Sequence, residues 1–84
     1  MVIMTSSVFT KKYQVFKELL TKYRKDTDVT QQILAERLQK PQSFVSKYES
    51  GERRLDLIEF LEVAEALQFE PSEFIKKLEK EASK

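Results

Sequence analysis

The chain has 84 residues, which is enough for one domain but leaves little room for a catalytic cleft. It has no cysteine and no histidine, which excludes disulfides, thiolate metal sites and imidazole catalysis, and its single glycine and two prolines argue against a turn-rich β fold. Although the net charge is only +1, residues 1–54 carry eleven basic and six acidic side chains, against four and eight in the remainder, which favours docking of one face onto an anion.

The first nine residues, MVIMTSSVF, are apolar but few, and no basic residue precedes them. They fit neither a secretory signal peptide nor a membrane span, so a cytoplasmic protein is expected. The same stretch is also a candidate surface for a homodimer, because it offers several apolar side chains. These are Val2, Ile3, Val8 and Phe9.

Two helices are predicted in the first half of the chain. The first runs from about Lys11 to Lys25, with Thr10 as its N-cap, since a threonine hydroxyl can accept a hydrogen bond from an unpaired amide. The second follows Thr30, another suitable cap, and ends near Leu38. Apolar residues recur at helical spacing along both segments, which indicates that each buries one face.

A third helix is predicted from about Pro41 to Glu49. Gly51 follows it, and the only glycine of the chain is best explained there as a left-handed C-terminal cap. Val45 and Tyr48 should face the core, which leaves a polar face on the opposite side. The polar face consists of Gln42, Ser43, Ser46 and Lys47.

The fourth helix is predicted from about Asp56, its N-cap, to Leu67, and the fifth begins at Pro71. The fifth helix and the residues before it offer more apolar surface than a monomer of this size needs. This region is therefore the second candidate for a homodimer interface. Its apolar residues are Phe69, Phe74, Ile75 and Leu78.

Residues 30–38, TQQILAERL, and residues 41–54, PQSFVSKYESGERR, form a long and specific pattern. It closely resembles the phage repressor/Cro (XRE-type) helix-turn-helix family, and the resemblance extends from about Tyr13 to Leu78. Two positions where the family usually has glycine hold Gln39 and Gln68. These two turns are therefore either strained or shaped differently.

The resemblance implies an all-α, five-helix bundle of the lambda-repressor type. The whole chain, residues 1–84, is then a single DNA-binding domain with its core at about 10–80 and the helix-turn-helix at about 30–50. In this family the second of the two motif helices enters the major groove of DNA. A helix pair of this kind without the pattern would be a weak signal, because small helical bundles contain similar turns.

The resemblance also assigns roles to single residues. Base contacts fall on the polar face and its border: Gln42, Ser43, Phe44, Ser46 and Lys47. Phosphate contacts fall on Gln31, Arg53 and Arg54. The competing interpretations are an ordinary solvated helix face, a solvated basic loop and, for Phe44, packing in the core instead of contact with a thymine methyl.

A further pair, Arg24 and Glu49, is implied to form a structural salt bridge. In related repressors an arginine near the end of the first helix pairs with the glutamate that ends the third. Such a pair in this chain would fix the recognition helix against the rest of the domain.

The expected function is that of a transcriptional regulator that binds double-stranded DNA sequence-specifically. A repressor that binds an inverted repeat as a homodimer is favoured, because one recognition helix reads few base pairs. No cofactor, metal or small-molecule ligand is expected. The alternatives are an antitoxin-type or other partner-binding role, an interaction module without DNA binding and, as the weakest, an enzyme.

Overall fold

The computed structural model describes residues 10–84, and this part of the chain is all-helical. Its elements are α1 (Lys11–Asp26), α2 (Gln31–Leu38), α3 (Gln42–Ser50), α4 (Leu57–Leu67) and α5 (Pro71–Ala82). The prediction of an all-α, five-helix fold is confirmed. The N-terminal candidate for a dimer surface, Val2, Ile3, Val8 and Phe9, lies outside the described residues.

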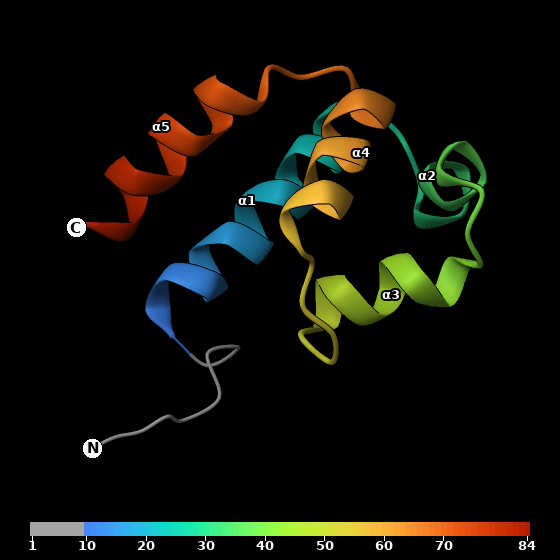
Figure 1. The fold of residues 1–84 in the computed structure, drawn as a ribbon, viewed down its shortest axis with the longest axis horizontal. Coiled ribbons are helices and arrows are strands. Elements are labelled where there is room, and N and C mark those ends of the chain that lie inside the picture. Colours follow the sequence, from blue (N-terminus) through green and yellow to red (C-terminus); the bar gives the residue numbers. More distant parts are fainter. Residues whose placement is uncertain (1–9) are drawn as a thin grey trace.

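The helices surround one core, with α5 alongside α1 and the α2–α3 pair at the other end of the bundle (Figure 1). α2 packs against α3 and α4, and α1 packs against α5 and α3. The largest fully buried side chains come from all five helices: Leu20, Leu34, Val45, Tyr48, Val63 and Phe74. Since each helix contributes to this core, the orientation of α3 is set by the packing of the whole domain.

Side-chain caps begin the helices where they were predicted. Thr10 and Thr30 each accept a hydrogen bond at 3.1 Å from the amide three residues later. Asp56 accepts from the amide of Glu59 at 2.7 Å, and the Glu59 carboxylate accepts from the amide of Asp56 at 3.0 Å. This reciprocal capping box satisfies two amides that the helix itself leaves unpaired.

Three helices end in a residue with left-handed backbone. Gly51 has φ of 92°, and Gln39 and Gln68 have φ of 58° and 60°. The two glutamines therefore adopt the strained form of the turn. α3 differs slightly from its prediction, since Pro41 precedes the helix as its N-cap residue and the helix ends at Ser50.

The apolar surface around the fifth helix is smaller than predicted, and its role as a dimer interface stays a prediction. Phe74 is fully buried, and Phe69 and Leu78 are half-buried. The Phe69 ring stacks on the Phe74 ring, with centroids 5.2 Å apart. Phe74, in the first turn of α5, also contacts the Phe16 ring of α1 and the Phe60 ring of α4. Phe69, just before α5, therefore belongs to the same cluster of rings. Only Ile75 keeps a large exposed fraction, 41%.

Candidate nucleic-acid interface

The outward side of α3 presents the polar residues expected there. Gln42, Ser43 and Lys47 are exposed and Ser46 is half-buried, whereas the inward Val45 is fully buried. Within residues 10–84, the side chains of Ser43, Ser46 and Lys47 form no hydrogen bond or ion pair. Their donors and acceptors are therefore available to a ligand.

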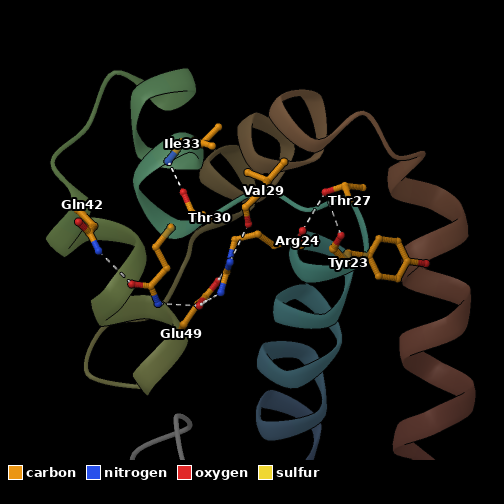
Figure 2. A network of polar contacts seen from close by, with 9 residues as sticks. Tyr23, Arg24, Thr27, Val29, Thr30, Ile33, Gln42 and Glu49 are labelled. Atoms are coloured by element: carbon orange, nitrogen blue, oxygen red, sulfur yellow. Dashed lines mark hydrogen bonds and ion pairs between the residues drawn. The ribbon is translucent and has the colours of Figure 1, made fainter.

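A buried ion pair joins α1 to α3 behind this face (Figure 2). Arg24 Nε lies 2.7 Å from Glu49 Oε2, and a second guanidinium nitrogen of Arg24 donates to Glu49 Oε1 at 3.0 Å. The third nitrogen donates to the carbonyl of Val29 at 2.7 Å. Both charged side chains are more than nine-tenths buried, and hydrogen bonding to Glu49 raises the pKa of Arg24 above its ordinary value. The predicted salt bridge is present in the structure.

Gln31, at the first turn of α2, extends this ion pair to the surface. Its Nε2 donates to Glu49 Oε1 at 2.9 Å, and its Oε1 accepts from Gln42 Nε2 at 3.4 Å. A carboxylate only accepts hydrogen bonds, so Gln31 must turn its amide nitrogen to Glu49 and its oxygen to Gln42. Gln31 and Gln42 thus sit at the exposed end of a chain of polar contacts that starts in the core.

Arg53 does not point freely into solvent. Its guanidinium forms two hydrogen bonds to the Glu59 carboxylate, at 2.7 and 3.0 Å, and lies 4.8 Å from the centre of the Phe44 ring. Hydrogen bonding to Arg53 in turn holds the pKa of Glu59 below its ordinary value. The loop after α3 is thereby tied to α4, with 42% of the Arg53 side chain still exposed.

Phe44 is half-buried and packs against the core, with its ring 5.8 Å from that of Tyr48. Besides Arg53, it has Lys40 nearby, whose Nζ lies 5.2 Å from the ring centre. The exposed Arg54 is separate and lies 4.7 Å above the ring of Tyr13. The structure thus gathers two basic side chains, Lys40 and Arg53, around Phe44 at the border of the polar face of α3.

Two residues of this region were missed by the sequence reasoning. Lys40 lies in the turn between α2 and α3, and Glu59 holds Arg53. The spacing Asp56-x-x-Glu59 is a recognisable capping box, so it could have revealed one of the two contacts of Glu59. The other contact joins a loop to a helix and has no sequence signal.

The arrangement is suited to binding a nucleic acid, which has a negatively charged backbone and base edges that form hydrogen bonds. Hydrogen-bonding side chains project from one short helix, and basic side chains flank them. Within residues 10–84 no group of three or more acidic side chains is placed to hold a metal ion. No helix of the described chain has the length and apolar character that crossing a membrane requires.

The fold and this face define a helix-turn-helix protein of the DNA-binding regulator class. A family model described as helix-turn-helix matches residues 20–74. A solved structure described as an XRE-family like protein from Pseudomonas syringae pv. tomato str. DC3000 is 45% identical, with a TM-score of 0.78, over 82% of this chain and 86% of that chain. No curated protein matches the chain. The chain belongs to the XRE-type helix-turn-helix family.

Proposed function

We propose that this protein is a transcriptional repressor that binds an inverted repeat in double-stranded DNA as a homodimer. The observation that carries the proposal is the polar face of α3. Three of its four side chains are exposed, while the helix is anchored by the buried ion pair of Arg24 and Glu49. A helix held in this way can enter a major groove without losing its orientation. A domain of this size would repress by occluding a promoter, in the cytoplasm, without a cofactor or enzymatic activity.

Base recognition is assigned to Gln42, Ser43, Phe44, Ser46 and Lys47. Gln42 carries a donor and an acceptor, which match the N6 and N7 edge of adenine. Lys47 can donate to guanine O6 or N7, and the serines can bond to a base or a phosphate. The half-buried Phe44 is assigned the methyl group of a thymine at the border of the contact.

Phosphate contacts are assigned to Gln31, Arg53 and Arg54. Gln31 lies at the start of α2, where helix amides also face the DNA backbone. One N–H of its amide is bound to Glu49, which leaves the other for a phosphate oxygen. Arg53 has five N–H donors and uses part of them on Glu59, so it can add a phosphate without leaving its place.

The proposal is tested by selecting bound duplexes from a random pool at near-physiological salt. The full chain is compared with the variant in which Gln42 and Lys47 are both changed to Ala. We expect an enriched inverted repeat with half-sites about one helical turn, roughly 34 Å, apart. The double variant should lose this enrichment, because the substituted side chains read bases.

Other outcomes of the selection separate the alternatives. Binding without enrichment that weakens steeply with salt would mean phosphate contacts alone, and would contradict sequence-specific regulation. Absence of binding would favour a partner-binding module of this fold, including an antitoxin. Co-purification with the product of a neighbouring gene would then be the next observation to seek.

A further inference from the structure

Tyr13, in the first turn of α1, contacts two successive residues of the loop that follows α3. It is only 6% exposed, and its hydroxyl accepts a hydrogen bond from the amide of Leu55 at 3.3 Å. The Arg54 guanidinium lies over its ring, 4.7 Å from the ring centre. One buried side chain of α1 thus holds a loop to which the proposed function assigns phosphate contacts.

The two arginines of this loop are held in different ways. Arg53 uses hydrogen-bond donors on the Glu59 carboxylate, whereas the exposed Arg54 side chain forms no hydrogen bond or ion pair within residues 10–84. Asp56 lines the same groove as Arg54, but its carboxylate caps α4 instead of pairing with the arginine. Contact with an aromatic ring leaves all five N–H donors of a guanidinium unused. Arg54 is therefore held in place and still able to bind an anion.

The ring beneath Arg54 is fixed by the core. The amide of Tyr13 donates to the hydroxyl of Thr10 in the cap of α1, and its ring lies 5.3 Å from that of Phe16. The Phe16 ring in turn contacts the rings of Phe60 on α4 and Phe74 on α5. An arginine side chain loses rotamer freedom when it binds a ligand, and a rigid ring that already orients it reduces this loss.

We propose that Tyr13 is a positioning residue for DNA binding, whose ring presents the Arg54 guanidinium to a phosphate of the DNA backbone. The hydrogen bond from Leu55 to the Tyr13 hydroxyl holds the loop against α1 and so keeps Arg54 above the ring. The inference rests on the phosphate contact of Arg54 in the proposed function, and it names the residue that orients this contact. Tyr13 does not touch the DNA in this arrangement and acts only through Arg54.

The test is a double-mutant cycle in the full chain, measured as the dissociation constant for a fluorescently labelled DNA duplex of arbitrary sequence at low salt. Such a duplex reports phosphate contacts without base recognition. Arg54→Ala should raise the dissociation constant by about tenfold, because a hydrogen bond between charged groups is lost. Tyr13→Leu should raise it by about fivefold. In the Arg54→Ala background, Tyr13→Leu should change it by less than about twofold, since the tyrosine then has nothing to orient.

Two further variants separate positioning from a purely structural role. Tyr13→Phe keeps the ring under Arg54 and should bind within about twofold of the unsubstituted chain. Tyr23→Leu is the matched control, because Tyr23 also lies on α1 and has Lys77 Nζ 5.6 Å from its ring, but this ring contacts α5 instead of the loop. It should lower the stability and leave the dissociation constant within about twofold of its original value. Circular dichroism checks that each variant is folded under the conditions of the titration.

The free protein offers a measurement that needs no variant. In NMR spectra of the unsubstituted chain, the ring current of Tyr13 should shift the side-chain protons of Arg54 upfield. Arg54 protons at their ordinary positions would contradict the proposal even if Tyr13→Leu does not fold.

Three results of the titrations would overturn the role of Tyr13 alone. These are additive effects of Tyr13→Leu and Arg54→Ala, binding by Tyr13→Phe as weak as that by Tyr13→Leu, and an equal loss in Tyr23→Leu. A chain that binds no duplex would overturn the proposed function and this inference with it. Coupling between Tyr13 and Arg54 in a protein that enriches no DNA sequence would support the positioning role and contradict only sequence-specific regulation.

Discussion

Glu49 makes two kinds of contact at once. Its carboxylate neutralises Arg24 in the interior. The oxygen Oε1, which accepts a hydrogen bond from the Arg24 guanidinium, also accepts one from the side-chain amide of Gln31 near the surface. The position of a side chain assigned to DNA is thereby coupled to a contact that holds α1 and α3 together. A change at Glu49 should consequently affect both stability and DNA recognition.

We expect Glu49→Ala to lower the free energy of unfolding by about 3–5 kcal/mol, because it leaves the Arg24 charge buried without its partner. Urea denaturation monitored by circular dichroism measures this loss. Asp26→Ala is the control, since it removes an ion pair with Lys22 in which both side chains are more than half exposed. Exposed pairs contribute about 0–1 kcal/mol, so the control should remain close to the original stability. Equal losses in the two variants would show that burial of the Arg24 pair has no special effect.

The individual contacts differ in how far they could be predicted from the sequence. The Arg24–Glu49 pair followed from a resemblance in which both positions are defined by the motif. The Arg53–Glu59 pair did not, because its geometry depends on the path of a loop between two helices. The same limit applied to Phe44, whose half-buried position depends on how α3 rotates against the core. The roles of the polar face of α3 in base contact stay predictions.

At the scale of whole elements, helix starts and ends are set by local chemistry. Capping by Thr10, Thr30 and Asp56 uses only atoms within three residues, which is why these starts could be predicted from sequence. The burial of Phe74 could not, because it requires rings from α1 and α4 to meet α5. Apolar content alone does not distinguish a core residue from an interface residue.

Gln68 ends α4 in the left-handed region, and we expect Gln68→Gly to stabilise the protein. The substitution removes a backbone strain of about 1–2 kcal/mol but adds freedom to the unfolded chain, for a net gain of about 0.5–1 kcal/mol. Gly51→Ala should have the opposite sign and cost about 1 kcal/mol, since its backbone is also left-handed. Thermal unfolding of the two variants measures both changes. A loss of stability in Gln68→Gly would mean that the glutamine side chain contributes more than its strain costs.

The whole molecule is nearly neutral, yet its charges are sorted along the chain. Basic residues lie beside the polar face of α3, whereas residues 55–84 carry eight of the fourteen acidic side chains. Such sorting lets a protein of low net charge attract DNA toward one surface and repel it from another. Net charge alone would not have predicted nucleic-acid binding.

Salt dependence should reveal how many phosphates the molecule contacts. Arg53→Ala in a dimer removes two proposed phosphate contacts, so the slope of log K against log salt should become less steep by about 2. The preferred DNA sequence should stay the same, because phosphate contacts carry no sequence information. Titrations with the selected duplex at several salt concentrations measure the slope. An unchanged slope would show that Arg53 serves only to tie the loop to Glu59.

The outward face of α3 carries side chains that are hydrogen-bonded to the rest of the domain and side chains that are not. Gln42 is linked through Gln31 to the buried ion pair, whereas Ser43 and Lys47 are exposed and unbonded within residues 10–84. Mutation can therefore change the second group at almost no cost in stability, while Gln42 is constrained by its neighbours. Under the proposed base contacts, substitution of Ser43 and Lys47 should change the DNA sequence that the protein prefers, whereas the contact assigned to Gln42 should be retained.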